Sequence, residues 1–222
     1  MENNNYEPGP KKNKVAEAAL DYIESGQIIG IGSGTTVHAL INKLETVKSK
    51  IEAVVSSSEL TTKMVKEKKI RVIELRESGM LPLYIDGADE SNDKRQLIKG
   101  GGGALTREKI IANSSEKFLC LIDDSKYVKT LGSFPLPIEV IKMSQSMVAL
   151  EMIKLGGRPV YRNDFITDNG NIILDVHGLE ILEPMALEQK INNIPGVVTN
   201  GLFAMRGADN LLISSDDGIK NM

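Results

Sequence analysis

The 222-residue sequence contains only one cysteine and two histidines. A single cysteine excludes an intrachain disulfide framework and a zinc site built on several thiolates. This residue, Cys120, lies in an apolar run, so we predict a buried side chain that behaves as a small hydrophobe. The histidines, His38 and His177, fall outside the four candidate site segments described below and are expected to be ordinary polar residues. This scarcity favours chemistry by a carboxylate base that works without a metal ion.

The sequence also lacks a long hydrophobic run and a marked excess of either charge. No stretch of about 18 apolar residues indicates a membrane span, and residues 1–14 lack the apolar run of a secretory signal. Lysine and arginine number 27 against 30 aspartates and glutamates, so the formal net charge of −3 gives no general reason to bind nucleic acid or a membrane. We expect a folded cytoplasmic protein without such partners, in which residues 1 to about 10 form a flexible extension.

The first 130 residues alternate short apolar runs with amphipathic patterns. The runs predict strands, and the patterns, whose apolar positions share one helix face, predict helices. The predicted strands are 27–31, 51–55, 71–75, 83–85 and 118–122, and the predicted helices are 15–25, 36–43, 59–68 and 106–112. Strands that alternate with helices are typical of an α/β fold with an open, doubly wound, mainly parallel, Rossmann-like sheet.

A different order of elements begins at residues 134–137, where Pro135 and Pro137 predict a linker. Strands are then predicted at 138–141, 165–167, 172–176 and 197–199, helices at 147–155 and 184–191, and a hairpin turn at 168–170. The order βαββαβ is typical of a ferredoxin-like α+β domain. A last strand at 211–214 can return to the first sheet. We therefore predict a Rossmann-like domain of residues 1–130 plus 206–222 and a smaller ferredoxin-like domain of residues 131–205.

Glycines and hydroxyl side chains follow the first predicted strand, in the segment GIGSGTT at residues 30–36. Glycines let the backbone approach a ligand closely, and the N–H groups at a helix start favour a phosphate. Ser33, Gly34, Thr35 and Thr36 are therefore candidate phosphate ligands. The segment matches neither the dinucleotide-binding fingerprint nor a P-loop, because Thr35 stands where the fingerprint needs glycine and no lysine follows. The alternative is a glycine-rich turn that serves packing alone.

Three carboxylates lie within the segment DGADE at residues 86–90, after another predicted strand. Such a cluster can bind a metal ion, hold sugar hydroxyls or act as a general acid and base. No histidine supports a metal site here. The candidate substrate contacts are Asp86, Gly87, Ala88 and Asp89, and a solvated turn is the alternative.

A third segment, KGGGGALTREK at residues 99–109, contains four consecutive glycines. Ordering them costs much conformational entropy, so an ordered loop is expected to bring backbone amides against a ligand. Lys99 and Glu108 place a cation and a carboxylate on either side of the loop, whereas a flexible linker is the alternative.

The fourth segment, DDSK at residues 123–126, places Lys126 after a strand, where it can reach a phosphate or lie on the surface. Three of the four segments begin where strands end, the edge at which α/β sheets bind ligands.

Together these motifs resemble the A type of ribose-5-phosphate isomerases. The resemblance extends from about Lys12 to the C-terminus and includes GIGSGTT, YIDGADE, IKGGGGALTREKI, DDSK and FPLPIEV, followed by LGGRPVYR, TDNGN, LDVHGLEI and IPGVVTNGLF. Several motifs in the right order are far more specific than any one of them. The chain has Ser-Gly-Thr-Thr where the family often has Thr-Gly-Ser-Thr, which keeps the hydroxyl donors in another order.

The resemblance implies interconversion of D-ribose 5-phosphate and D-ribulose 5-phosphate, an aldose–ketose isomerisation of the non-oxidative pentose phosphate pathway. It implies no cofactor and no metal ion. Glu108 is then the base that moves a proton between C2 and C1 through an enediolate. Lys99 and the amides of Gly100, Gly101 and Gly102 would stabilise the developing oxyanion.

The resemblance also assigns roles at the other end of the substrate. Asp86 and Asp89 are expected to hold sugar hydroxyls and to assist opening of the furanose ring. The phosphate is expected at residues 33–36, with positive charge from Lys126 and a weaker contribution from Lys12. The expected assembly is a homodimer, possibly a homotetramer.

Other classes of protein stay open at this point. A non-catalytic sugar-phosphate-sensing domain would use the same phosphate loop and would not need Lys99 together with Glu108. An amino-sugar-phosphate deaminase-like enzyme would need a catalytic histidine near the motifs. A coenzyme A transferase would need its glutamate within the sequence motif of that class of enzyme.

Overall fold

The computed structural model describes residues 9–222, and its largest element is a six-stranded sheet. The strands are β1 (Gln27–Ile31), β2 (Ile51–Ser56), β3 (Leu81–Gly87), β6 (Ser115–Asp123), β12 (Asn210–Ser215) and β13 (Gly218–Asn221), in the order β13-β12-β6-β3-β1-β2. Neighbouring strands from β12 to β2 pair in parallel, and β13 joins β12 as an antiparallel hairpin. The predicted open, mainly parallel sheet is confirmed, and so is the return of the strand at 211–214 to it.

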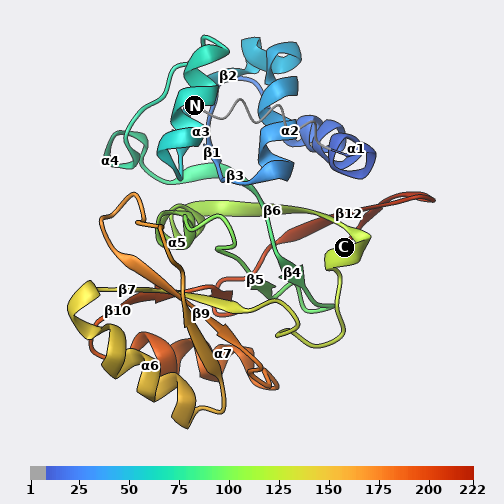
Figure 1. The fold of residues 1–222 in the computed structure, drawn as a ribbon. Coiled ribbons are helices and arrows are strands. Elements are labelled where there is room, and N and C mark those ends of the chain that lie inside the picture. The colour runs from blue at the N-terminus through green and yellow to red at the C-terminus, as the bar shows by residue number, and fades with distance from the viewer. Residues whose placement is uncertain (1–8) are drawn as a thin grey trace.

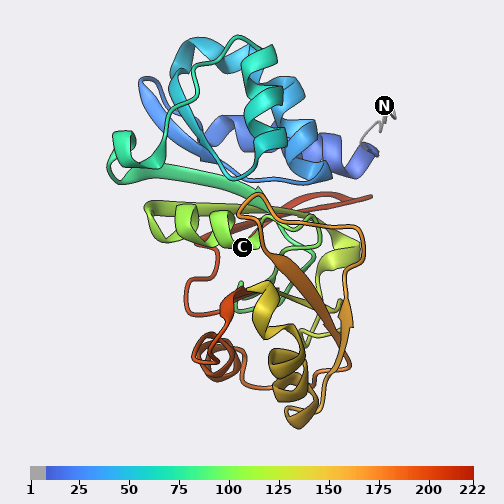
Figure 2. The ribbon, with the colours of Figure 1, turned by 60° about the vertical axis from the view of Figure 1, so that its left-hand side comes forward.

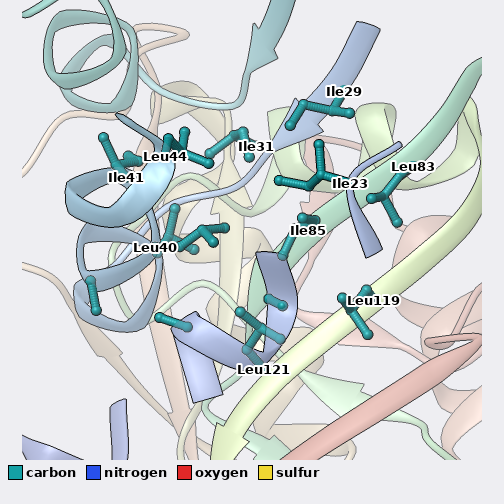
Figure 3. Packing of buried hydrophobic residues seen from close by; sticks show 14 of the residues in the cluster. Ile23, Ile29, Ile31, Leu40, Ile41, Leu44, Leu83, Ile85, Leu119 and Leu121 are labelled. Atoms are coloured by element: carbon teal, nitrogen blue, oxygen red, sulfur yellow. The ribbon is translucent and has the colours of Figure 1, made fainter. Parts of the chain in front are cut away.

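Both faces of this sheet are covered by helices. The helices in this part of the chain are α1 (Pro10–Ala19), α2 (Thr35–Lys43), α3 (Glu59–Glu67), α4 (Leu75–Ser78) and α5 (Leu105–Asn113). Leu83 and Ile85 of β3 pack in a buried cluster with α1 and α2, part of which Figure 3 shows. Tyr84 points to the opposite face, as the two-residue period of a strand requires, and packs with α5 and the buried Cys120. Figure 1 shows α1 and α2 above the sheet and α5 below it, which confirms a doubly wound fold.

A second, smaller sheet has four antiparallel strands in the order β10-β7-β9-β8. Its elements are β7 (Leu136–Val140), α6 (Gln145–Lys154), β8 (Arg158–Tyr161), β9 (Ile172–His177), α7 (Pro184–Asn192) and β10 (Val197–Asn200). Both helices pack on one face of the sheet through a separate buried cluster that includes Val148, Met152 and Ile191. Figures 1 and 2 show α6 and α7 on the side away from the six-stranded sheet. The order βαββαβ agrees with the predicted ferredoxin-like pattern, while the exact domain boundaries stay a prediction.

A three-stranded sheet that the sequence did not indicate lies between the two larger ones. It consists of β4 (Glu90–Ser91), β5 (Leu97–Ile98) and β11 (Leu202–Phe203), in the order β11-β5-β4. Because β5 directly precedes the glycine loop and β11 directly follows the smaller sheet, their pairing fixes the start of this loop against the second half of the chain. The N–H of Lys99 continues the pairing by donating to the Gly201 carbonyl at 2.9 Å.

The strand predicted at 71–75 is wrong. Val72 makes a single bridge with Val54 of β2, and the chain then turns into the short helix α4. Glu74 and Glu77 form a reciprocal capping box at the start of this helix. The helix that this capping box starts ends the extended segment before it can pair with β2 over several residues.

The strand predicted at 165–167 is also wrong, although the turn at 168–170 is present. β8 ends at Tyr161, and Asp164 has a φ of +54°, which bends the chain out of the sheet. Phe165 packs instead against Gly103, where its ring fills the space that a side chain would need. The N–H of Gly170 donates to the Thr167 carbonyl and closes the turn.

Pro137 lies inside β7 and not in a linker. Its carbonyl accepts a hydrogen bond from the Gly201 N–H at 2.8 Å, so its missing N–H faces the same side of the strand. The last residue pair with β10 on that side joins Ile138 to Asn200, and the proline lies just beyond it. The proline therefore removes no hydrogen bond from the ladder, which explains how a strand accepts it.

The first helix begins at Pro10 and ends at Ala19, earlier than the predicted 15–25, because proline favours the first turn of a helix. The predicted flexible extension lies, as far as residue 8, outside the described residues. Within residues 9–222, no helix combines the length and the apolar character needed to cross a bilayer.

Phe118 of β6 provides a test of the core. Its side chain is fully buried, and its ring centroid lies 4.9 Å from that of Tyr84. We expect Phe118→Ala to lower the free energy of unfolding by about 3–5 kcal/mol in urea titrations, because it leaves a cavity. The control Met143→Ala removes a side chain that is 96% exposed and should change stability by less than about 0.5 kcal/mol. A loss below about 1 kcal/mol for Phe118→Ala would contradict the described packing.

Candidate active site

The four segments singled out in the sequence meet around one cavity. Parallel strands place their following loops at the same edge of a sheet, which is where the ends of β1, β3 and β6 lie. The cavity is lined by Ser33, Gly34, Thr35, Thr36, Gly87, Ala88, Asp89, Lys99, Gly100, Gly101, Gly102, Glu108 and Lys126. These are all of the predicted site residues except Asp86 and Lys12, the latter expected only as a weaker contributor.

Asp86 is completely buried behind the cavity wall. Its Oδ1 accepts hydrogen bonds from the N–H groups of Ser33 (3.1 Å) and Gly87 (2.7 Å). Its Oδ2 accepts the hydroxyl of Tyr84 and lies 2.6 Å from Lys99 Nζ. Both carboxylate oxygens are thus already engaged within the protein, so Asp86 holds other site residues in place. Sequence reasoning missed Tyr84, although its position two residues before Asp86 on a strand places both side chains on the same face.

Lys99 is buried between two carboxylates and a carbonyl, with 3% of its surface exposed. Its Nζ donates to the Gly87 carbonyl at 2.6 Å, pairs with Asp86 Oδ2 at 2.6 Å and lies 3.3 Å from Glu108 Oε2. Two of its three N–H bonds therefore serve the protein. The third is left for the region beside Glu108, where the cavity begins.

Glu108 lies in the first turn of α5 and is also 3% exposed. Its Oε1 accepts the hydroxyl of Ser33 at 2.6 Å. Within the described part of the chain, its Oε2 has no hydrogen-bond partner, because the contact with Lys99 is an ionic one without hydrogen-bond geometry. One oxygen of a buried carboxylate at the cavity wall is thus available to accept a proton.

The protonation of this pair follows from its surroundings. Burial raises the pKa of Glu108, and the negative charge of Asp86 raises it further, whereas Lys99 and the Ser33 hydroxyl lower it, with a result of about 7. Burial lowers the pKa of Lys99, but the charges of Asp86 and Glu108 more than compensate and raise it above its ordinary value. At neutral pH the site therefore combines a charged lysine with a carboxylate that can both take and return a proton.

The opposite end of the cavity suits an anion. The helix α2 begins there, directly after Gly34, which has a φ of +91° and no side chain to cap the first N–H groups. Lys12 Nζ donates to Thr35 Oγ1 at 2.8 Å, which brings a positive charge to the first residue of α2. Lys126 Nζ lies 3.8 Å from Asp89 Oδ1. N–H groups at a helix start together with two ammonium groups are the usual means of holding a phosphate.

The three carboxylates of the DGADE segment do not converge. Glu90 turns away from the cavity, and its two oxygens accept the N–H groups of Gly132 and Phe134. Asp89 alone of the three lines the cavity, where it accepts the Gly101 N–H at 2.8 Å. In residues 9–222, no group of three or more histidine, cysteine, aspartate and glutamate side chains is placed to hold a metal ion.

Two residues of the smaller sheet hold the site from outside, and the sequence motifs gave no role to either. Arg162, which follows β8, donates to the carbonyls of Gly100 and Gly101. Glu139 of β7 is completely buried and accepts the hydroxyl of Thr106 at the start of α5. No local signal could reveal these contacts, because they join residues that are far apart in the chain and come together only when both sheets have formed.

The position of Glu108 predicts how its carboxyl group titrates. We expect a pKa of about 7 for Glu108 in carboxyl-edited NMR or infrared titrations of the protein. Asp86→Asn removes a negative neighbour and should lower this pKa, whereas Ser33→Ala removes a hydrogen bond to the charged form and should raise it. Titration of Glu108 near 4.5, the value of an unperturbed carboxyl group, would contradict the described burial.

Comparison with known proteins agrees with this site. A family model described as ribose 5-phosphate isomerase A (phosphoriboisomerase A) matches residues 53–218. A second model, the DeoR C-terminal sensor domain, matches residues 9–76, a stretch that includes the GIGSGTT loop but ends before Asp86, Lys99 and Glu108.

Several solved structures are similar to this chain over almost its whole length. Ribose 5-phosphate isomerase A from Neisseria gonorrhoeae is 43% identical, with a TM-score of 0.94, over 96% of this chain and 95% of that one. The enzyme from Methanocaldococcus jannaschii is 36% identical, with a TM-score of 0.89, over 96% and 97% of the two chains. A D-ribose-5-phosphate isomerase in complex with phospho-erythronic acid is 34% identical, with a TM-score of 0.90, over the same shares. The predicted resemblance is confirmed: the chain belongs to the ribose 5-phosphate isomerase A family.

Proposed function

We propose that this chain interconverts D-ribose 5-phosphate and D-ribulose 5-phosphate, with Glu108 as the base. The observation that carries the proposal is the buried Oε2 of Glu108, which accepts no hydrogen bond from the described residues and lies 3.3 Å from the charged Lys99. Family membership and the relative bound to phospho-erythronic acid support a sugar phosphate as the substrate.

The reaction needs one base that reaches two adjacent carbons. Glu108 Oε2 removes the proton from C2 of the open-chain aldose, and the electron pair of that bond forms the C1–C2 double bond as the C1 carbonyl becomes an oxyanion. The same carboxylic acid then returns the proton to C1, while the C2 hydroxyl gives up its proton to the oxygen on C1 and becomes the carbonyl. A base with a pKa of about 7 serves both halves of this transfer.

The negative charge that develops on oxygen needs fixed positive groups. The third N–H bond of Lys99 and the amides of the loop formed by Gly100, Gly101 and Gly102 are assigned to it. Asp86 is assigned to holding Lys99 in place rather than to a sugar hydroxyl, since both of its oxygens are already engaged.

The remaining contacts anchor the rest of the substrate. We assign the phosphate to Ser33, Gly34, Thr35 and Thr36, because these residues line the cavity around the start of α2. Lys126 supplies charge there, and so does Lys12 through its place beside Thr35. The cavity residues Gly87, Ala88 and Asp89 are assigned to the sugar, with Asp89 holding hydroxyls and assisting opening of the furanose ring.

A sugar-phosphate-sensing domain would account for the phosphate loop alone. It would not account for a buried lysine beside a buried carboxylate whose Oε2 accepts no hydrogen bond, an arrangement that suits catalysis by proton transfer. A deaminase-like enzyme would need a histidine in the cavity, whose lining contains none. The isomerase is therefore the function that fits the site best.

The wider organisation of the protein is proposed along the same lines. The catalytic domain comprises residues 1–130 and 206–222, and the smaller domain residues 131–205. The protein works in the cytoplasm, as a homodimer or a homotetramer. Apolar side chains exposed on α6, among them Met147, Leu150 and Ile153, support a contact between copies.

Glu108→Gln tests the role of the base. We expect the variant to fold, to keep KM within about threefold and to lose kcat by about 100-fold or more, because the amide cannot accept the proton. In the wild type, kcat/KM should also fall as the pH falls below about 7, where Glu108 becomes protonated. Any residual activity of the variant should not show this fall. Turnover of the variant near the wild-type rate, measured by ribulose formation, would remove Glu108 from the proposal.

Lys126→Met tests the phosphate end. The expected result is a rise in KM of about tenfold or more with kcat changed much less, because the lost charge serves binding in the ground state and in the transition state alike. Lys94→Met, in which an exposed lysine outside the cavity is lost, is the matched control and should leave both constants unchanged. A fall in kcat with an unchanged KM in Lys126→Met would contradict this assignment.

A further inference from the structure

The glycine loop is held from its outer side by an arginine of the smaller sheet. Arg162, directly after β8, donates through Nη1 to the carbonyls of Gly100 (3.3 Å) and Gly101 (3.2 Å), and through Nη2 again to Gly100 (3.3 Å). The same guanidinium is fixed by Asp175 of β9, with Nε to Oδ2 at 2.8 Å and Nη2 to Oδ1 at 2.5 Å. Its carbon also lies 5.3 Å from the centre of the Phe165 ring. The five N–H donors of the Arg162 guanidinium thus have acceptors in two peptide carbonyls and one carboxylate.

The orientation of these carbonyls determines where the amides of the loop point. The peptide bonds of the described chain are all trans, and in a trans peptide the carbonyl and the following N–H point in opposite directions. Because Arg162 holds the Gly100 carbonyl outward, the Gly101 N–H points inward, and it indeed donates to Asp89 at the cavity at 2.8 Å. The Gly101 carbonyl is held outward in the same way, so the Gly102 N–H also points inward.

The Gly102 N–H is the amide that this arrangement leaves for a ligand. Gly102 lines the cavity, and a side chain on it would lie 3.9 Å from the Ser33 hydroxyl, which itself binds Glu108. Within residues 9–222, no acceptor from the protein engages this N–H, whereas its neighbours Gly101 and Gly103 donate to Asp89 and to the Gly100 carbonyl. An unpaired amide beside the base is where an oxyanion of the substrate can be stabilised.

We propose that Arg162 is a positioning residue for catalysis, which aims the Gly102 amide at the oxyanion by holding the Gly100 and Gly101 carbonyls on the outer side of the loop. Glycine residues have the freedom to rotate their peptide planes, and the loop has four in succession, so it needs an external constraint to keep one orientation. The smaller sheet supplies this constraint. The inference rests on the proposed isomerase function and adds to it a role for the second half of the chain.

The test compares Arg162→Met and Arg162→Lys with Arg158→Met. Arg158 is the first residue of β8, the strand that directly precedes Arg162, and its side chain is exposed, so its variant controls for the loss of a nearby positive charge. Ribose 5-phosphate turnover is measured for each variant, and phospho-erythronic acid, which is bound by a relative, serves as the probe for counting intact sites. Thermal melting reports how much folded protein each preparation contains.

We expect Arg162→Met to lower kcat per intact site by at least about tenfold while KM changes by less than about threefold; intact sites are counted at saturating phospho-erythronic acid, because its carboxylate can use the same amide. Arg162→Lys should fall between this variant and the wild type, because an ammonium can hold one carbonyl but cannot span both and Asp175. Arg158→Met should behave as the wild type. The pH dependence of kcat/KM should keep its limb near 7 in all three variants, since Glu108 does not contact Arg162.

A purely structural role would lower the melting temperature and the number of intact sites but leave kcat per site unchanged, and this result overturns the inference. Equal losses for Arg158→Met and Arg162→Met overturn it as well, because they would reduce the effect to general charge. If the wild type itself does not turn over ribose 5-phosphate, the proposed function fails and the inference with it. Normal turnover by the wild type together with an unaffected Arg162→Met refutes only the positioning role.

Discussion

The arrangement of the site depends on one buried ammonium group. Lys99 lies between Asp86, Glu108 and the Gly87 carbonyl, with 3% of its surface exposed. Removing a charge from water is expensive unless partners with good geometry replace the lost hydration. Asp86 provides this compensation, and its own oxygens are in turn saturated by backbone N–H groups and by Tyr84. Burial raises the pKa of Glu108, and the negative charge of Asp86 raises it further. Lys99, which both carboxylates share, lowers it only in part, so the pKa is about 7.

The site also depends on cooperation between the two larger sheets. The six-stranded sheet supplies the GIGSGTT loop, Asp86 and Lys126 from the ends of its strands. The glycine loop and the start of α5 lie between this sheet and the smaller one, which holds them through Arg162 and Glu139. Glu139 accepts hydrogen bonds from Thr106 on one side and from the 167–171 turn on the other, so a buried carboxylate ties that turn to the helix that carries the base. The smaller sheet therefore does more than add stability, because its side chains bind both the glycine loop and the start of α5.

Local sequence was sufficient to predict the class of fold and almost all of the cavity lining. Glycine-rich and acidic segments after apolar runs stand at strand ends in any parallel sheet, so their convergence follows from topology alone. The failures have a different origin. The run at 71–75 is as apolar as a strand, yet a capping box at Glu74 starts a helix, and 165–167 is drawn out of the sheet by Phe165 packing on Gly103. The capping box is a local signal that the apolar run outweighed in the prediction, whereas the contact of Phe165 with Gly103 joins residues that are far apart in the chain.

Individual roles were harder to predict than positions. A side chain on Gly32 would lie 1.9 Å from the Asp86 carboxyl group, so this glycine is required by a buried aspartate and not by the approach of a phosphate. Asp86 itself has a carboxylate suited to binding sugar hydroxyls, and only the hydrogen bonds around it show that no oxygen is free. Arg162 and Glu139 belong to the second half of the chain, where the sequence predicted a separate fold but no part in the site.

The central claim is that one carboxylate, Glu108, carries the proton between C2 and C1. Its most direct test is the isomerisation of ribose 5-phosphate in deuterium oxide, followed by NMR of the product at C1. The wild type should introduce solvent deuterium at one of the two C1 positions, because the proton on a carboxyl group beside an open cavity exchanges with water, and Glu108→Gln should do so at least about 100-fold more slowly. Deuterium incorporation by Glu108→Gln at the wild-type rate would contradict the account.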